Sequence, residues 1–130
     1  GVLGGSGNDT LTGGENADFI DGGDDNDRLF GRGGDDDLRG GLGSDFMSGG
    51  TGDDQLIGDD GSDKMFGGSG DDTLNGGRDK DTIHGGDGND EIKGGRLADV
   101  LNGGAGALSP IALAALAASF HARIASVISR

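Results

Sequence analysis

The chain of 130 residues has no cysteine, tryptophan or tyrosine, and it contains one proline and few bases. Without cysteine, no disulfide framework can compensate for a small hydrophobic core. No run of about 20 apolar residues is present, so we expect no segment that spans a bilayer. The chain has only ten bases but 24 acids. This balance disfavours nucleic acid as a partner, because phosphate binding requires positive charge.

The sequence is instead rich in glycine, with 32 residues, and its acids follow a strict period. Every ninth residue is an aspartate, and these column aspartates are Asp9, Asp18, Asp27, Asp36, Asp45, Asp54, Asp63, Asp72, Asp81, Asp90 and Asp99. The residue five before each of them is always glycine, and the residue two after is always a large aliphatic residue or methionine. The composition alone is typical of disorder, but three columns in one phase indicate a stacked repeat architecture.

The first nine-residue unit spans residues 4–12, and ten more follow without insertion to Asn102. The first six residues of a unit are rich in Gly, Asp and Asn, which favour tight turns. The last three place one apolar residue between mostly polar ones, which indicates a minimal half-buried strand. Two units then make one turn of a coil. We therefore predict an all-β, right-handed parallel β-roll (a β-solenoid) of about 5.5 turns over residues 1–103.

Alternate units should contribute to opposite sheets of this roll. We expect the inward residues to be Leu11, Leu29, Met47, Met65, Ile83 and Leu101 in one sheet and Ile20, Leu38, Leu56, Leu74 and Ile92 in the other. Phe30, Phe46 and Phe66 occupy outward positions of one sheet, within reach of one another. They form either an aromatic patch that marks a partner surface or isolated surface side chains. His84, also at an outward position, is expected to be a solvated side chain.

The first unit, Gly4-Gly5-Ser6-Gly7-Asn8-Asp9-Thr10-Leu11-Thr12, resembles the RTX nonapeptide Gly-Gly-x-Gly-x-Asp-x-U-x, where U is a large apolar residue. The resemblance covers residues 4–102 and implies a calcium-binding parallel β-roll of a type I secreted bacterial protein. It implies that each calcium lies between loops of adjacent turns. Asp9 would then pair with Asp27 along one edge, and Asp18 with Asp36 along the other.

The resemblance implies two kinds of metal ligand, the carboxylates of the column aspartates and backbone carbonyls of the glycine-rich loops. The loop residues implied as carbonyl ligands are Gly4, Ser6, Gly22, Gly23, Gly40, Gly41, Gly43, Gly49, Gly50, Gly52, Gly67, Gly68, Gly70, Gly85, Gly86 and Gly88. Eleven units in two rows offer about nine sites between loops. The terminal aspartates Asp9, Asp18, Asp90 and Asp99 would have a neighbour on one side only.

The chemistry of the repeat favours calcium independently of the family. Calcium takes six to eight oxygen ligands in flexible geometry, and carboxylates and carbonyls supply only oxygen. Zinc or copper would require histidine or cysteine, which the repeats lack apart from His84. Stacked aspartates without a cation would repel one another. We therefore expect a fold that forms on calcium binding and is lost in chelator.

Six residues depart from the glycine pattern of the loops. Arg32 and Asp59 replace the second glycine of their units, and the third is replaced by Asn16, Asp25, Asp79 and Leu97. These departures mark either weaker sites or tolerated drift in a redundant array. Asp25 and Asp79 can retain the turn conformation, whereas Leu97 predicts strain or fraying in the last unit.

The repeat fails in its twelfth copy, where Leu108 stands in the aspartate position, and residues 104–130 form a different kind of segment. Ser109 is a helix N-cap candidate before Pro110, and residues 111–129 carry one apolar stripe on an alanine-rich background. Three alternatives are open for this predicted amphipathic helix. It caps the end of the roll, belongs to a C-terminal export signal, or is incidental sequence.

Taken together, the residues predict a calcium-binding module rather than an enzyme, because a core one residue thick offers no catalytic pocket. The resemblance implies a secreted module that supports type I export and the folding of an attached upstream domain. Two alternatives are a structural or adhesive spacer, as in a surface layer, and the non-catalytic C-terminal module of a secreted protease, lipase or epimerase. Because Gly1-Val2-Leu3 lies in the phase of a preceding unit and shows no signal peptide, we expect the chain to be a piece of a longer protein.

Overall fold

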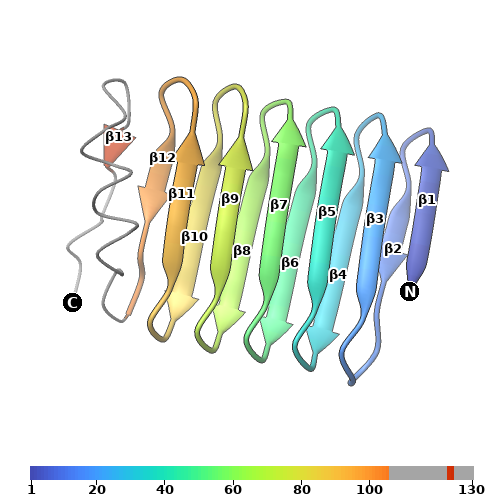
Figure 1. Ribbon diagram of the computed structural model, residues 1–130, viewed down its shortest axis with the longest axis horizontal. Coiled ribbons are helices and arrows are strands. Elements are labelled where there is room, and N and C mark those ends of the chain that lie inside the picture. The colour runs from blue at the N-terminus through green and yellow to red at the C-terminus, as the bar shows by residue number, and fades with distance from the viewer. Residues whose placement is uncertain (106–122, 125–130) are drawn as a thin grey trace.

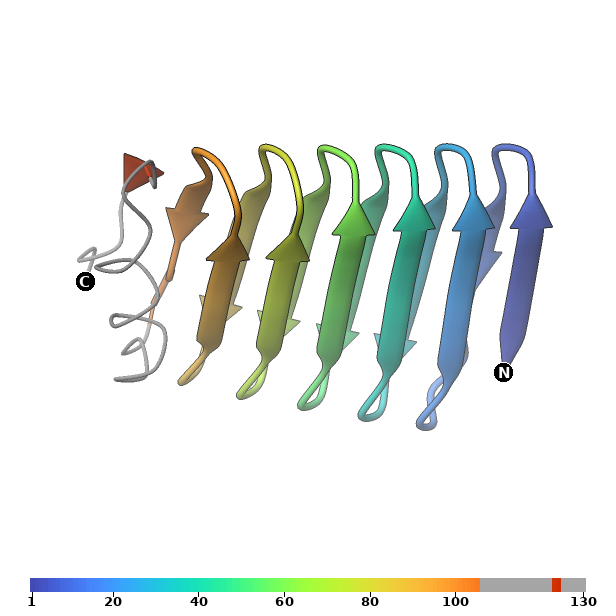
Figure 2. The same ribbon diagram turned by 45° about the horizontal axis from the view of Figure 1, so that its top comes forward.

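A computed structural model describes residues 1–105 and 123–124 of the chain. The described residues form an all-β parallel solenoid of about six turns, flattened into two sheets (Figures 1 and 2). In Figure 1 the chain rises through the front sheet, crosses to the rear sheet at the top, and moves leftward with each turn, so the coil is right-handed. The predicted fold class is therefore confirmed.

The two sheets alternate along the chain. The six-stranded sheet contains β1 (Val2–Ser6), β3 (Phe19–Asp24), β5 (Asp37–Leu42), β7 (Gln55–Asp60), β9 (Thr73–Gly77) and β11 (Glu91–Gly95). The seven-stranded sheet contains β2 (Thr10–Thr12), β4 (Arg28–Gly33), β6 (Phe46–Thr51), β8 (Lys64–Ser69), β10 (Thr82–Asp87), β12 (Val100–Asn102) and β13 (Arg123–Ile124). Within the repeats all pairs are parallel with a shift of 18 residues, as in Leu38 opposite Leu56, so equivalent residues of alternate units stack in columns.

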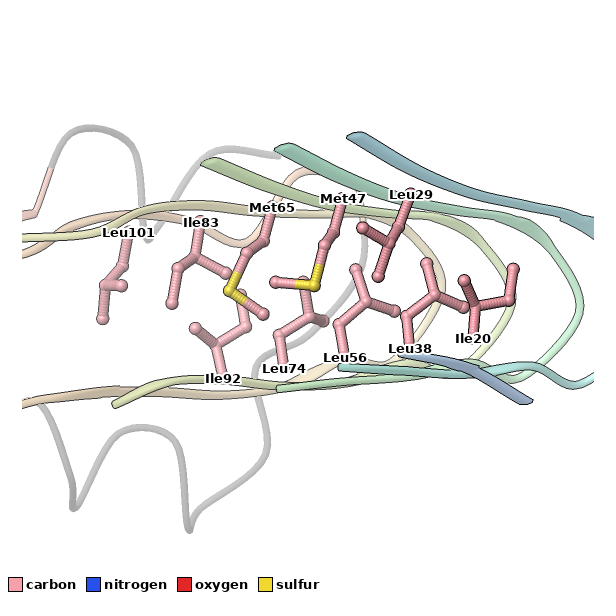
Figure 3. Packing of buried hydrophobic residues seen from close by; sticks show 10 residues of the cluster. All are labelled: Ile20, Leu29, Leu38, Met47, Leu56, Met65, Leu74, Ile83, Ile92 and Leu101. Atoms are coloured by element: carbon pink, nitrogen blue, oxygen red, sulfur yellow. The ribbon is translucent and has the colours of Figure 1, made fainter. Parts of the chain in front are cut away.

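The hydrophobic core consists of two facing rows of side chains, one row from each sheet (Figure 3). Ten of the eleven predicted inward residues are 0–1% exposed, and Leu11 is partly buried at the N-terminal end beside Val2. Each fully buried aliphatic side chain stabilises the fold by about 2 kcal/mol. With one such residue per unit, however, the apolar contribution is small for the length of chain that must be ordered.

The strands are longer than the sequence predicts. Interior strands such as β6 and β8 run for six residues, from the residue after a column aspartate through the third residue of the next unit. The expected three-residue strand was wrong because the first two glycines of most units belong to the strand and not to the turn. The first glycine of each unit instead points inward and is buried in most units, for example Gly49 and Gly67. The reversal of the chain is confined to the residues around each column aspartate.

Five of the six residues that depart from the glycine pattern keep a positive φ, as the glycines at the equivalent positions do. Arg32, Asp25, Asp59, Asp79 and Leu97 have φ between 70° and 84°. This left-handed region costs a non-glycine residue about 1–2 kcal/mol, which supports the predicted strain at Leu97. Asn16 differs, because it has no positive φ, and the loop after the short strand β2 follows another path.

An aromatic ladder crosses the outer face of the seven-stranded sheet, as the spacing of the phenylalanines predicts. The Phe30 and Phe46 ring centroids are 5.6 Å apart, and so are those of Phe46 and Phe66. His84 extends this ladder, stacked on Phe66 at 4.8 Å. The expectation of a solvated His84 was therefore wrong: its ring is half-buried, and this burial lowers the pKa of His84.

The predicted C-terminal helix over residues 111–129 lies outside the described residues, except at Arg123 and Ile124. These two residues form strand β13, which pairs in parallel with β12. The stacking of the repeats also reaches the third residue of the failed twelfth unit, through a parallel bridge between Asp87 and Ala105. Among the described residues there is no helix long and apolar enough to cross a membrane.

Candidate metal-binding edges

The column aspartates line two edges of the roll, where the chain passes from one sheet to the other. Those of the odd-numbered units (Asp9, Asp27, Asp45, Asp63, Asp81 and Asp99) follow the strands of the six-stranded sheet, and we call this side the odd edge. Those of the even-numbered units (Asp18, Asp36, Asp54, Asp72 and Asp90) follow the seven-stranded sheet and form the even edge. In Figure 1 the odd edge is at the top and the even edge at the bottom.

The column aspartates are buried although their side chains are ionisable. The nine from Asp27 to Asp99 are 0–3% exposed, and only Asp9 and Asp18, in the first turn, are half-buried. Aspartate is almost never fully buried unless it is paired. Nine buried carboxylates in a chain of this size therefore require a partner.

One oxygen of each buried carboxylate has a partner in the protein. Oδ1 accepts a hydrogen bond from the backbone N–H of the column aspartate one turn earlier, beginning with Asp9 N–H to Asp27 Oδ1 at 2.7 Å. The same bond joins every later pair on both edges, at 2.8–3.0 Å. The structure thus brings together the pairs that the sequence predicts, such as Asp9 with Asp27 and Asp18 with Asp36.

The second oxygen, Oδ2, is buried without any hydrogen-bond partner in ten of the eleven column aspartates. The exception is Asp18, whose Oδ2 accepts the N–H of Gly14 at 2.7 Å in the irregular loop of the second unit. An unpaired buried polar atom costs about 1–3 kcal/mol, and more when it is charged. Ten such oxygens in two regular rows indicate that a cation completes the structure.

Glycine is required at the first position of each unit because it leaves room for this oxygen. A Cβ on Gly22 would lie 2.5 Å from Asp27 Oδ2 and 2.7 Å from the carbonyl oxygen of Gly40, in the next turn. Both distances are too short for real atoms. The first glycines and the column aspartates are therefore needed together, because the glycine leaves the space that the carboxylate oxygen occupies.

The glycines predicted to supply carbonyl ligands also stack in columns. The second glycines, such as Gly23, Gly41, Gly50, Gly68 and Gly86, have positive φ, and each lies against the carbonyl of the equivalent residue one turn earlier. The third glycines, such as Gly43, Gly52, Gly70 and Gly88, behave in the same way at the edges. The loops that contain these glycines therefore present their carbonyl oxygens in register with those of their neighbours.

No group of three or more His, Cys, Asp or Glu side chains gathers into a metal site within the part of the chain that the structure describes. Carboxylates alone therefore cannot supply a full coordination shell, and any ion must also use backbone carbonyls. An all-oxygen donor set of this kind fits a hard cation such as calcium and disfavours zinc and copper.

Burial raises the pKa of the column aspartates. The pKa rises from 3.8 to about 6 in Asp45 and Asp54, to about 7 in Asp72 and Asp81, and to about 8 in Asp63. Loss of hydration is the largest cause in each case, the hydrogen bond from the preceding turn opposes it, and neighbouring carboxylates add to it. Without a cation, the protein environment therefore opposes the charged form of these groups.

These shifts predict that acid partly replaces the cation. Because the pKa of each group is higher in the folded chain than the 3.8 of the unfolded chain, the folded state binds more protons. This contribution to stability is fully present below about pH 4 and is lost as the pH rises through about 6 to about 8. In chelator, we expect the far-UV circular dichroism signal for β structure to increase as the pH is lowered from 8 to 4. A β signal that is unchanged or largest at alkaline pH would contradict this.

Comparison with known proteins agrees with the geometry of the two edges. The RTX calcium-binding nonapeptide repeat, in its four-copy form, matches residues 3–38, 39–74 and 66–101. No curated protein and no solved structure matches the chain. The matched residues include all eleven column aspartates and both rows of buried oxygens. The chain belongs to the RTX calcium-binding nonapeptide repeat family.

Proposed function

We propose that the roll is a calcium-gated folding module, in which the ions bind between adjacent turns on both edges. The observation that supports this most directly is the set of ten buried Oδ2 atoms without a partner. The column aspartates would provide Oδ2, and the loop glycines would provide carbonyl oxygens. Bound calcium supplies positive charge and accepts six to eight such oxygens without demanding a rigid geometry.

Charge balance supports a high occupancy. The repeats carry 24 acids and eight bases. About nine calcium ions, one for each pair of adjacent loops on an edge, would contribute about 18 positive charges. The net charge of the repeats would then fall close to zero, and the repulsion between stacked carboxylates would be removed.

The biological role that we infer from this gating is assistance to secretion. A chain that cannot fold where calcium is scarce stays unfolded and can pass through a type I export channel. It then folds outside the bacterial cell, where calcium is available. The folded roll would then help an attached upstream domain to fold. We infer that the module itself does no chemistry, and that in a secreted protease, lipase or epimerase it would be the non-catalytic part.

A calorimetric calcium titration of the full chain tests the proposal. We expect saturable uptake of about nine ions per chain at up to millimolar concentration, with magnesium as a control that gives much weaker uptake because it demands a tighter octahedral geometry. Titration without saturable calcium uptake would refute the proposed function.

A second candidate function, lateral packing of rolls as a structural element, is favoured by one observation. In the even-numbered strands β2 to β12 of the seven-stranded sheet, the outward residues on either side of the inward apolar residue include no acid. They include the aromatic ladder, Arg28 and Lys64. The corresponding residues of the six-stranded sheet include Asp21, Asp37 and Glu91. Sedimentation in calcium distinguishes the candidates, because ordered polymers support lateral packing and a monomer excludes it.

A further inference from the structure

The two edges of the roll differ in the residue that precedes each column aspartate. On the even edge this residue is an exposed aspartate in three successive loops, Asp35, Asp53 and Asp71, which we call the outer aspartates. On the odd edge the first four loops carry uncharged residues here, namely Asn8, Asn26, Ser44 and Ser62. The repeat motif leaves this position free, so the difference belongs to this chain.

The outer aspartates form a second hydrogen-bond ladder, which runs opposite to the ladder of the column aspartates. The N–H of Asp53 donates to Asp35 Oδ1, the N–H of Asp71 to Asp53 Oδ1, and the N–H of Asn89 to Asp71 Oδ1, each at 2.9 Å. In the column ladder the later residue accepts, whereas here it donates. Each outer aspartate thus uses one oxygen to hold the next loop.

The odd edge shows that this bond does not require a charge. Asn26 N–H donates to Asn8 Oδ1 at 2.9 Å, and Ser44 N–H donates to Asn26 Oδ1 at 2.8 Å. An amide oxygen therefore joins neighbouring loops as well as a carboxylate oxygen does. Three like charges at successive turns, about 4.8 Å apart, repel one another. The charges of the outer aspartates are unfavourable to the fold unless a cation compensates for them.

The same three loops contain the buried oxygens that need such a cation. Asp36, Asp54 and Asp72 are 1–2% exposed, and Oδ2 of each has no partner. The outer carboxylates act on these groups electrostatically, since Asp35 and Asp53 both contribute to raising the pKa of Asp54. The three residues before each column aspartate include five acids and no base on the even edge, but four acids and three bases on the odd edge. The bases are Arg78, Lys80 and Arg96.

We propose that the two edges load calcium in sequence, the even edge at lower concentration, and that Asp35, Asp53 and Asp71 set this order through their charge. The inference rests on the proposed function, because it concerns the affinity of the same sites. The even edge would bind its ions first and fix the spacing of the turns. The odd edge would then bind its ions at a higher calcium concentration.

The test is a calcium titration of the full chain by calorimetry at low ionic strength, with circular dichroism on the same samples. The wild type should show two affinity classes. In the variant D35N/D53N/D71N the tighter class should weaken about five- to tenfold, the change expected for one charge acting on a divalent ion across about 7 Å of water-like medium. Asparagine retains the Oδ1 acceptor, so the variant removes charge while preserving the ladder.

A matched variant adds three charges at the equivalent positions of the odd edge. N26D/S44D/S62D should strengthen the weaker class by a similar factor and bring the two classes together. Raising the ionic strength to about 1 M should reduce the effect of both variants, because the Debye length there is about 3 Å, shorter than the separation of about 7 Å between charge and ion. Equal affinities on the wild-type edges, or an unchanged titration of D35N/D53N/D71N, would overturn this inference and leave the proposed function standing. Absence of calcium uptake by the wild type would refute the proposed function itself.

Discussion

In excess chelator at neutral pH, the chain is expected to lose the far-UV circular dichroism signal of its β-roll, and to regain it at millimolar calcium. Ten buried Oδ2 atoms would lack a partner without the ion. At about 1–3 kcal/mol for each atom, the total penalty is about 10–30 kcal/mol, which equals or exceeds the 5–15 kcal/mol by which ordinary domains are stable. The double row of core residues is too small to offset it.

Two controls make this prediction specific to calcium. Magnesium at the same concentration should restore much less β structure, because it gives up its water ligands reluctantly. Sodium chloride of equal ionic strength should have little effect, because screening does not reach buried groups effectively. Equal β content in calcium and in chelator would contradict the prediction.

Replacement of a first-position glycine by alanine should destabilise the roll strongly. A Cβ on Gly67 would lie 2.5 Å from the carbonyl oxygen of Gly85 and 2.9 Å from Cβ of Asp72, and it would also collide with Asp72 Oδ2. These atoms belong to the backbone and to a short buried side chain, so they cannot move aside cheaply. We expect Gly67→Ala to cost about 3 kcal/mol or more, the upper range for overpacking a core.

Gly14→Ala is the matched control. Gly14 is also a repeat glycine, but its φ is not positive, and the nearest atom to its Cβ position is Asp18 Oδ2 at 3.7 Å. This variant should be neutral or slightly stabilising, because alanine restricts the unfolded chain. Urea unfolding in saturating calcium measures both variants. Similar stabilities for Gly67→Ala and Gly14→Ala would contradict the steric argument.

The architecture could be predicted from the sequence because the period determines it. A period of nine with one apolar residue per unit places Leu38 and Leu56 on one sheet and Leu29 and Met47 on the other, and all four are fully buried. The pairing of Asp9 with Asp27 was implied by the resemblance to the RTX repeat, and it agrees with the same shift of two units. These features depend on spacing alone, and spacing is unaffected by the details of packing.

The features that were missed depend on which neighbour a residue meets. The six-residue strands were missed because the turn preference of glycine does not reveal that Gly49 points inward. The stacking of His84 on Phe66 had an available signal, since the two residues are 18 positions apart and pair directly between β8 and β10. The hydrogen bond to each Oδ1, and the isolation of Oδ2 that accompanies it, required atomic positions.

Because paired strands are shifted by 18 residues, the length of the rod can change by whole turns without changing how the turns pack. Each interior turn contacts its neighbours through the same register, from β3 with β5 to β9 with β11. Removal or duplication of any two consecutive units would therefore join surfaces that already fit. A gene encoding such a chain can lengthen or shorten its product by recombination between repeats, and each step changes the number of metal sites without requiring a new core.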